Sequence, residues 1–419
     1  HRIQEPASTG GSQTSRGSCN GDHCRRRDSE LLCKEKETLL VGRREKMKVV
    51  VAVDSFKGSM TSMQAGNAVK RGILSACPNA EVVVCPVADG GEGTTDALIE
   101  GLGGEKISLT VTGPYEDFVS CYYGWLSKQK TAVMEMASAA GITLVKERNP
   151  LRASTRGVGE MIADALKRGC RNFIIGIGGS ATNDGGIGML KALGYSFLDE
   201  KGQDVGEGAQ ALGKVMKIDT DKRNPLLEQA HFQIACDVTN PLCGVNGATY
   251  IFGPQKGVAE EQKQPLDEAM HHYAEVVEQH FHCDAMNQAG AGAAGGLGFA
   301  FLTFLGGELI PGVSLVLSVN GLEKELQDAD IAVTGEGKLD AQSIMGKAPI
   351  GVARLAKKYG VKTVAFAGSI GDDAGECNRA GIDAFFPIVR GVTTLEEAME
   401  TERAEKNMEA AVEQVFRLL

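Results

Sequence analysis

Residues 47–77, MKVVVAVDSFKGSMTSMQAGNAVKRGILSAC, decide the fold class. Residues 49–53 form a continuous apolar run, DSFKGS is a loop that contains glycine, and residues 61–77 repeat apolar side chains with helical periodicity. Residues 82–85 are apolar again. Wholly apolar strands that alternate with amphipathic helices indicate a parallel sheet covered on both faces. The stretch therefore predicts an α/β protein whose first strand follows Met47 directly.

The same alternation returns near the C-terminus, while the middle of the chain has a different pattern. Short β-type runs at 331–333, 361–366 and 384–389 are accompanied by a helical stretch at 351–359. In between, 107–111, 119–125 and 132–136 read as consecutive strands with turns at Gly113-Pro114 and 127–129, which is typical of antiparallel hairpins. A helix at 158–166 and a strand at 173–176 complete this middle region. We therefore predict a discontinuous Rossmann-like parallel-sheet domain, residues 47–105 plus 300–419, an inserted α+β domain, residues 106–299, and an active site in the cleft between them.

Residues 1–46 are polar, rich in Gly, Ser and Arg, and unpatterned. We interpret them as a disordered extension, natural or vector-derived, with Met47 as the natural start. Cys19, His23, Cys24 and Cys33 could suggest a metal site, but their irregular spacing favours an unstructured tail.

Composition restricts the kind of partner. The net charge is −10, and residues 47–419 alone carry −13, so the body offers no basic surface for nucleic acid or for an anionic membrane. The 11 cysteines form no CxxC pair, which favours reduced thiols in a cytoplasmic protein. Apolar stretches are far shorter than a membrane span needs. A small diffusible substrate is the remaining expectation. A homodimer is one option for the assembly, and the sequence leaves the oligomeric state open.

Five glycine-rich clusters carry the chemistry: DSFKGS (54–59), ADGGEGT (88–94), GIGGSATNDGG (176–186), GAGAAGGLG (290–298) and TGEGKLDAQS (334–343). All but the fourth follow a predicted strand, where open α/β sheets place their ligand loops. Each could be mere turn chemistry. Together they predict loops whose backbone N–H groups bind phosphates. No GxxxxGK[ST] motif occurs, so this is not a P-loop protein. The predicted nucleotide contacts are Gly178, Gly179, Ser180, Thr182, Asn183, Gly335, Glu336 and Gly337.

Phosphoryl transfer also requires a divalent metal held by carboxylates, a cation near the transferred group, and a base or orienting group for the attacking hydroxyl. The clusters contain Asp54, Asp89, Glu92, Asp184, Glu336 and Asp340, which we place in loops, and Lys57 in a strand-to-helix turn. We predict that Asp184, Lys57 and Asp89 are catalytic and that Mg²⁺ binds among Asp184, Asp89, Glu336 and Asp340. For any one of these acids, helix N-capping is the structural alternative.

The predicted substrate contacts come from several segments: Ser55, Glu92, Arg152, Asp237 and Lys256. Arg152 and Arg156 could bind a carboxylate with two hydrogen bonds, or could be surface charges. Lys256 follows a run of Asx-turn residues and could be a substrate contact, a nucleotide contact or a solvated loop charge. The histidines at 271, 272, 280 and 282 belong to one amphipathic stretch and are predicted to decorate its polar face.

At this point the residues resemble a known family, the bacterial-type glycerate kinases that are unrelated to P-loop and ribokinase-like enzymes. The matching strings include DSFKGS, ADGGEGT, MEMASAAG (134–141), RNPLRASTRGVGE (148–160), IGIGGSATNDGGIGML (175–190), CDVTNPLCG, FGPQKG, GAGAAGGLG and TGEGKLDAQSIMGKAP (334–349). The resemblance implies transfer of the ATP γ-phosphoryl group to D-glycerate with magnesium, two domains with the site between them, and 2-phosphoglycerate as product. Formation of 3-phosphoglycerate is the alternative.

Two other classes of function were compared with this one. Gly176, Gly178 and Ala181 form a GxGxxA after a strand, which is the fingerprint of a nicotinamide-dependent dehydrogenase, but the polar TNDGGIG that follows is a poor helix start. A ligand-binding regulator would not need acids beside phosphate-binding loops. Release of ADP from ATP, magnesium and glycerate would mark the kinase.

Overall fold

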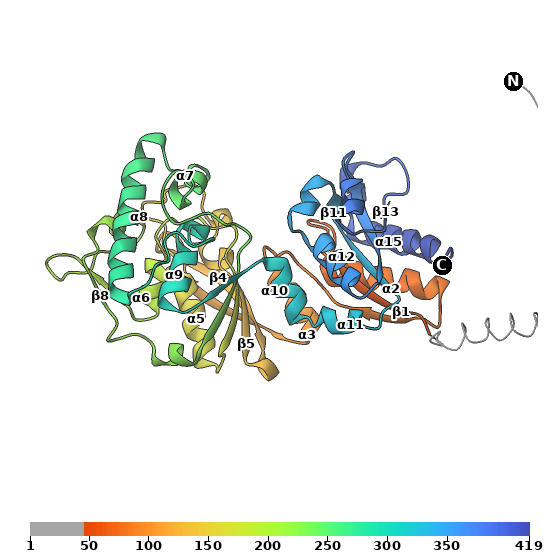
Figure 1. Cartoon of the computed structure of the whole chain (residues 1–419), viewed down its shortest axis with the longest axis horizontal. Coiled ribbons are helices and arrows are strands. Elements are labelled where there is room, and N and C mark those ends of the chain that lie inside the picture. Colours follow the sequence, from red (N-terminus) through yellow and green to blue (C-terminus); the bar gives the residue numbers. More distant parts are fainter. Residues whose placement is uncertain (1–45) are drawn as a thin grey trace, which may run out of the picture. The chain divides into compact units, whose positions relative to one another are not determined.

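The computed structural model describes residues 46–419, of which residues 47–419 form one compact unit (Figure 1). The predicted extension, residues 1–46, lies outside the described residues apart from Lys46. The α/β fold class is confirmed, since two sheets built largely of parallel strands are each covered by helices.

The first sheet contains the strands predicted at both ends of the chain. Its order is β13-β12-β11-β1-β2, and every neighbouring pair is parallel. β1 is buried along its whole length, and after Lys48, whose ammonium is paired with Glu325 and Asp328, its residues 49–53 are apolar on both faces. The bounds are β1 (Lys48–Val53), β2 (Glu81–Val84), β11 (Ile331–Leu339), β12 (Lys362–Ile370) and β13 (Ala384–Pro387).

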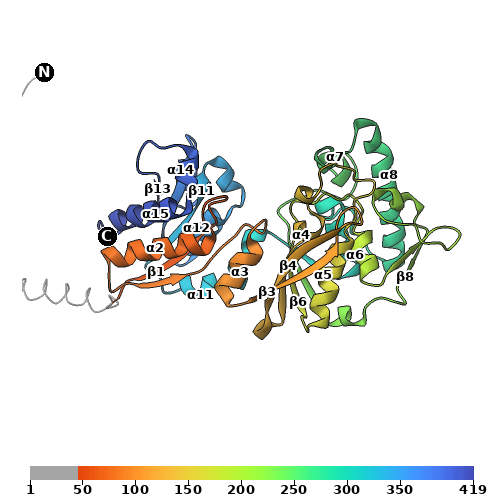
Figure 2. The same cartoon turned by 180° about the vertical axis from the view of Figure 1, so that it is seen from behind.

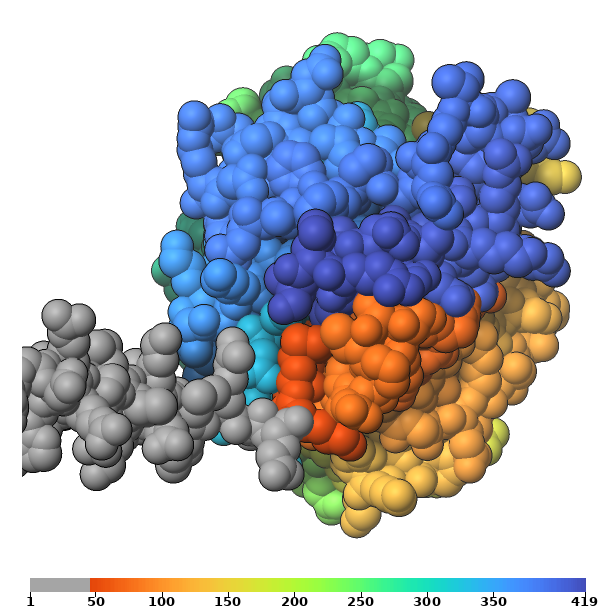
Figure 3. All heavy atoms as spheres, turned by 90° about the vertical axis from the view of Figure 1, so that its right-hand side faces the viewer, coloured from red at the N-terminus to blue at the C-terminus, as the bar shows by residue number. Residues whose placement is uncertain are grey.

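Two helices from opposite ends of the chain cover one face of this sheet. α2 (Ser62–Ala76) has Thr61 as its N-cap, and the Thr61 side chain accepts a hydrogen bond from the N–H of Gln64 in a capping box. α15 (Thr401–Phe416) packs along α2, and Gly72 allows the close approach because a Cβ there would lie 2.5 Å from the carbonyl oxygen of Glu409. Figure 3 shows these N-terminal (orange) and C-terminal (dark blue) segments side by side.

The other face of the first sheet is covered by α10 (Gly312–Val319), α11 (Leu322–Leu326) and α12 (Ala348–Lys358). Helix α10 is shared between the two sheets. Its Val313 and Leu317 pack in the core of the first sheet, whereas Leu315 and Val316 pack in a core of the second. Helix α10 therefore contributes to the cores of both sheets, and Figure 1 shows it between them; Figure 2 shows the same sheets from behind.

The second sheet has the order β10-β9-β6-β5-β4-β3. The predicted hairpins are present, because β3, β4 and β5 pair antiparallel, but β5, β6, β9 and β10 pair parallel. The middle region is thus a mixed sheet rather than the antiparallel piece expected, since the connection through α5 brings β6 back beside β5 in the same direction. The bounds are β3 (Glu105–Thr112), β4 (Phe118–Leu126), β5 (Thr131–Glu135), β6 (Asn172–Gly176), β9 (His231–Ala235) and β10 (Glu308–Ile310). The domain boundaries stay a prediction, and β10 lies beyond the expected end of the insertion at 299.

A large core on one face of the second sheet is formed with α5 (Arg156–Lys167), α6 (Ile187–Ala192), α8 (Glu260–Phe281) and α9 (Leu297–Phe304). The opposite face packs on α3 (Thr94–Leu102) and α10. Shorter elements are α4 (Ala137–Ala140), α7 (Ala248–Phe252), α13 (Glu376–Ala380), α14 (Leu395–Met399) and the antiparallel pair β7 (Ser196–Leu198) and β8 (Lys217–Asp219). The 3₁₀ turns are η1 (Ser127–Gln129), η2 (Ile142–Leu144), η3 (Ala209–Lys214), η4 (Pro225–Gln229), η5 (Pro254–Lys256), η6 (Ala293–Gly295) and η7 (Ala341–Met345). Within residues 46–419, no helix combines the length and apolarity needed to cross a membrane.

Candidate active site

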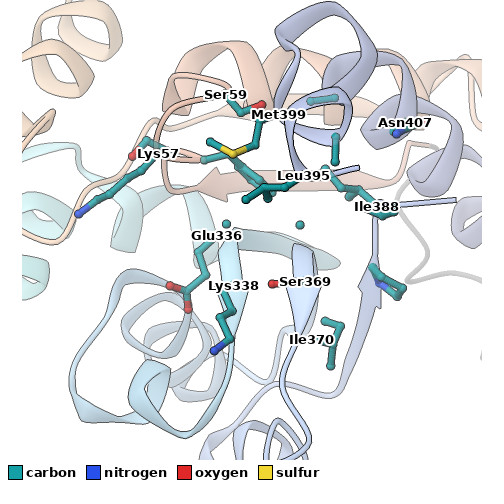
Figure 4. A pocket seen from close by; sticks show the side chains of 18 of the residues that line it. Lys57, Ser59, Glu336, Lys338, Ser369, Ile370, Ile388, Leu395, Met399 and Asn407 are labelled. Carbon is teal, nitrogen blue, oxygen red and sulfur yellow. The ribbon is translucent and has the colours of Figure 1, made fainter. Parts of the chain in front are cut away.

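A cavity of about 810 Å³ opens at the carboxyl edge of the first sheet, where β1, β11, β12 and β13 end. We call it the first pocket (Figure 4). This is the edge at which open parallel sheets bind ligands. One side is charged and the other is apolar. The charged side chains are Asp54, Lys57, Asp89, Glu336, Lys338 and Lys347, and the apolar ones include Phe56, Ile370, Pro387, Ile388, Val389, Leu395 and Met399.

Asp54 follows β1 directly and is buried, with the N–H of Ser55 donating to its Oδ1 over 2.6 Å. Burial raises the pKa of Asp54 to about 7, and the nearby carboxylates of Asp89 and Glu336 act in the same direction. Lys57 is exposed, and its Nζ lies 3.9 Å from Oδ2 of Asp89. The first pocket thus gathers acids that repel one another and would be stabilised by a bound cation.

Glu336 lies inside strand β11 and not in a loop, so the loop prediction for TGEGK was wrong. The cause is close sheet packing, since a Cβ on Gly335 would lie 2.1 Å from the carbonyl oxygen of Phe366 in β12. Glu336 is buried, its Oε1 has no hydrogen-bond partner among the described residues, and Nζ of Lys347 lies 3.4 Å from its Oε2. Burial raises the pKa of Glu336. Gly337 lines the first pocket as predicted for a ligand contact, whereas Gly335 does not.

Asp340 caps the 3₁₀ turn η7, where it accepts from the N–H of Gln342 over 2.9 Å. Lys338 Nζ lies 3.0 Å from its other oxygen and lowers the pKa of Asp340. Asp340 lines neither the first pocket nor the second pocket described next. Its surroundings favour the capping alternative over a metal ligand.

The second pocket, of about 400 Å³, lies at the carboxyl ends of β6 and β9. Gly178, Gly179 and Ser180 follow β6, and Cys236, Asp237 and Val238 follow β9. The remaining lining residues are Asp89, Gly90, Gly91, Ile142, Ile177, Ala235, Phe252, Gln255, Lys256, Ala293 and Ala294. Asp89 lines both pockets.

Asp89 is held by a short turn that connects the two sheets. Its Oδ1 accepts from the N–H of Gly91 over 3.0 Å. Gly90 has φ of +88°, and a Cβ there would lie 2.6 Å from Cα of Gly312 in α10. Gly90 is therefore required by its left-handed backbone and by its close packing against α10. Asp237 also contacts the start of α10, because its Oδ1 accepts a hydrogen bond from the N–H of Gly312 over 2.8 Å.

Asp184 has different surroundings. It is completely buried, and neither pocket reaches it. Its Oδ2 accepts from the N–H and hydroxyl of Thr155 and from the N–H of Gly188, while its Oδ1 accepts from the N–H of Gly186. Burial raises the pKa of Asp184 against the opposing effect of these hydrogen bonds. The carboxylate therefore accepts hydrogen bonds from backbone N–H groups at the start of α6, which is the role that the capping alternative describes.

The other predicted site residues divide between the pockets and the rest of the chain. Ser55 lines the first pocket; Gly178, Gly179, Ser180, Asp237 and Lys256 line the second. Thr182 and Asn183 are buried outside both pockets, and Glu92 and Arg152 are exposed outside both. Arg156 forms an ion pair with Glu207 instead of pointing into a pocket. The predicted nucleotide contacts are thus split between two cavities.

The sequence did not reveal the apolar wall of the first pocket, nor Lys338 and Lys347, which also line this pocket. Lys338 lies within β11 next to Gly337 of the fifth cluster, and Lys347 stands immediately before α12 next to Gly346, just after that cluster. Their position beside glycines is the signal that could have identified them. The wall, which includes Ile388, Leu395 and Met399, carries no motif, since it is formed by the loop after β13 together with α14. Within residues 46–419, no group of three or more His, Cys, Asp or Glu side chains is arranged to hold a metal ion.

An open α/β sheet with lysines and carboxylates at its carboxyl edge, and a second small pocket that shares one aspartate, is compatible with an enzyme that transfers a phosphoryl group to a small molecule. The sequence profile described as the glycerate kinase family matches residues 49–419. This chain belongs to the glycerate kinase family.

Relatives and a solved structure agree with that assignment. A protein named glycerate 2-kinase from Escherichia coli is 46% identical over 354 residues, which cover 84% of this chain and 93% of that protein. A glycerate kinase from Halalkalibacterium halodurans is 45% identical over the same shares. A crystal structure from Salmonella typhimurium LT2, assigned as glycerate kinase 2, superimposes with a TM-score of 0.83 at 40% identity, covering 89% of this chain and 98% of that one. The family resemblance noted from the motifs is confirmed, and so is the kinase class; the dehydrogenase alternative is withdrawn.

Proposed function

We propose that this protein transfers the γ-phosphoryl group of ATP to D-glycerate and releases 2-phosphoglycerate and ADP. The observation that carries the proposal is the position of Asp89, which lines two pockets of different character and has Lys57 beside it. A kinase needs two ligands to meet at one reacting centre, and Asp89 lines both of these cavities.

The first pocket suits the nucleotide. Its apolar wall offers surface for a purine, and Lys57, Lys338 and Lys347 offer cations for the phosphates (Figure 4). The second pocket is smaller and suits the acceptor. In the reaction an acceptor hydroxyl loses its proton, its oxygen forms a bond to the γ-phosphorus, and the bond from that phosphorus to the β–γ bridging oxygen breaks, so that ADP leaves. Asp89 is positioned to orient the hydroxyl or accept its proton, and Lys57 to stabilise charge on the transferred group.

Magnesium fits the acids of the first pocket. Asp54 and Glu336 are buried carboxylates with raised pKa, Oε1 of Glu336 lacks a hydrogen-bond partner among the described residues, and Asp89 is adjacent to Asp54. Mg²⁺ in kinases binds one or two carboxylates together with phosphate oxygens, so a full protein cage is not required. One or two of the carboxylates of Asp54, Asp89 and Glu336 would hold it together with phosphate oxygens, and the ion would neutralise phosphate charge. Of the four metal ligands predicted from the sequence, Asp89 and Glu336 are retained in this proposal.

The choice of the 2-hydroxyl rests on the name of the Escherichia coli relative. Phosphorylation of the 3-hydroxyl is the alternative. Phosphorus NMR of the product, or coupling to enolase without phosphoglycerate mutase, separates them: direct turnover by enolase supports the proposal, and a product that enolase cannot use identifies 3-phosphoglycerate. No ADP release from ATP, magnesium and glycerate would reject both.

A cytoplasmic location and a homodimer also belong to the proposal. The lack of a CxxC pair among the cysteines and the acidic body support the cytoplasmic location. Light scattering after size-exclusion chromatography would test the homodimer.

A further inference from the structure

The second pocket contains a buried lysine. Lys256, in the 3₁₀ turn η5, is only 2% exposed, and its Nζ donates to Oγ of Ser180 and to the carbonyl oxygen of Thr182, both over 2.7 Å. Both acceptors are neutral. Among residues 46–419, no carboxylate lies within 4.0 Å of this Nζ.

A buried ammonium without a counter-ion is costly, because burial removes its hydration and neutral oxygens replace it only in part. The group has three N–H donors, and two are used. Burial lowers the pKa of Lys256 to about 7, and the carboxylate of Asp184 is the charged group that opposes this shift. A structural role in the protein alone would be served better by a neutral side chain. The site therefore favours an anionic ligand.

The surroundings of Lys256 are suited to a small anion. The loop after β6, residues 178–180, lines the same pocket as the lysine. Gly179 has φ of +74°, and the space around Gly178 is open, since a Cβ there would have no atom within 4 Å. Ala293 and Ala294 limit the pocket on another side. The acids of the same pocket, Asp89 and Asp237, come from other segments, and neither is paired with Lys256. The pocket thus has one cationic part and one acidic part.

We propose that Lys256, supported by Ser180, binds the carboxylate of the acceptor and makes the second pocket selective for small hydroxy acids. This inference rests on the proposed function. With the carboxylate on Lys256, the hydroxyls of the same small molecule extend toward Asp89, which lines both pockets. Lys256 is then the residue that distinguishes a hydroxy acid from a neutral polyol or amide.

The test compares Lys256→Met with the wild type on two acceptors, D-glycerate and the neutral D-glyceramide, at saturating ATP and magnesium. In the wild type we expect a strong preference for glycerate in kcat/KM. In Lys256→Met we expect the KM for glycerate to rise on the order of a hundredfold, and the preference to fall toward one, since the amide never used the ammonium. The KM for ATP should change less than about threefold, because the nucleotide occupies the first pocket.

Lys217→Met is the matched control, since Lys217 is an exposed lysine in β8 outside both pockets, and it should behave as wild type. An unchanged preference for glycerate in Lys256→Met, or a loss that falls on the KM for ATP, overturns the inference. If Lys256→Met fails to fold, Ser180→Ala serves instead, with a smaller rise in the KM for glycerate expected and an unchanged KM overturning the inference.

Binding without nucleotide separates this inference from the proposed function. D-glycerate should raise the melting temperature of the wild type, while glyceramide and Lys256→Met should show no such shift. If glycerate binds in this way but is never phosphorylated, the proposed function fails and the inference stands. If glycerate is phosphorylated while Lys256→Met keeps the wild-type preference, the inference fails and the function stands.

Discussion

Asp89 and Asp184 look alike in the sequence, because each stands among glycines after a strand, yet the structure gives them opposite surroundings. Asp89 lines two pockets, accepts one hydrogen bond from Gly91 and lies beside an exposed lysine. Asp184 is fully buried, and four donors of the chain saturate its oxygens. A carboxylate that is already saturated by its own chain has little capacity left for a metal or a substrate. Accessibility and the number of internal donors therefore separate a reactive aspartate from a structural one.

The largest expected effect is on turnover in Asp89→Asn. Asparagine keeps an oxygen that can accept from the N–H of Gly91, so the turn should survive. The negative charge that we propose orients the acceptor and attracts the metal is lost. We expect kcat to fall about a hundredfold or more, with little change in melting temperature. Steady-state kinetics and thermal melting of the same preparation measure both.

Asp184→Asn also replaces a carboxylate with an amide, but here we expect stability to fall and turnover to be kept. The side-chain NH₂ would face the N–H groups of Thr155 and Gly188, or the N–H of Gly186 if the amide flips, so buried donors lose their acceptor. We expect the free energy of unfolding to fall by about 3 kcal/mol. Turnover per folded molecule at saturating substrate should stay near normal. Urea unfolding and active-site titration measure the two quantities.

These two variants are controls for each other. If Asp184→Asn keeps its stability and loses turnover, the capping role is wrong and the original catalytic assignment returns. If Asp89→Asn loses stability and keeps turnover, Asp89 is removed from the reaction.

The α/β class could be predicted because central strands such as β1 are buried on both faces. KVVVAV in β1 and the helix that starts at Thr61 have patterns that burial and capping impose locally. The parallel pairing of β5, β6, β9 and β10 could not be derived from the hairpin pattern, since pairing partners are set by tertiary crossovers rather than by local sequence.

The candidate site could be predicted only in part. The chemistry-bearing residues of the motifs that line a pocket are Asp54, Lys57, Asp89, Asp237, Lys256 and Glu336. Glycine clusters locate loops and close packing, but they do not say which polar side chain in the loop is exposed; Asp184, Thr182 and Asn183 are buried instead. The apolar wall around Leu395 and Met399 had no signal, because apolar residues in a short helix look the same whether they face a core or a ligand.

A smaller effect on turnover is expected from Lys57→Ala. Lys57 is exposed, and its Nζ is 3.9 Å from Asp89, so its cation acts through solvent-screened charge rather than a tight contact in the unliganded protein. We expect kcat to fall roughly tenfold to a hundredfold, with an unchanged melting temperature. Lys128→Ala, which removes an exposed lysine from η1, is the control. A fall in turnover equal to that of the control would exclude Lys57 from the reaction.

The last expected effect is on the pH dependence of stability, and it comes from Asp54. The pKa of Asp54 is about 7 in the folded protein, against 3.8 for an unperturbed aspartate, because burial and the charge of Asp89 disfavour ionisation. Between these values the folded state holds a proton that the unfolded state has lost, so the free energy of unfolding falls as pH rises from about 4 to about 7, by at most about 1.4 kcal/mol per pH unit. Asp54→Asn removes this proton and should flatten the fall. Thermal melting of the unliganded protein between pH 5 and pH 8 should therefore show a steeper decline for wild type than for Asp54→Asn, with Asp221→Asn, a change at an exposed aspartate, following the wild type. Parallel curves for wild type and Asp54→Asn would mean that Asp54 is ionised throughout this pH range.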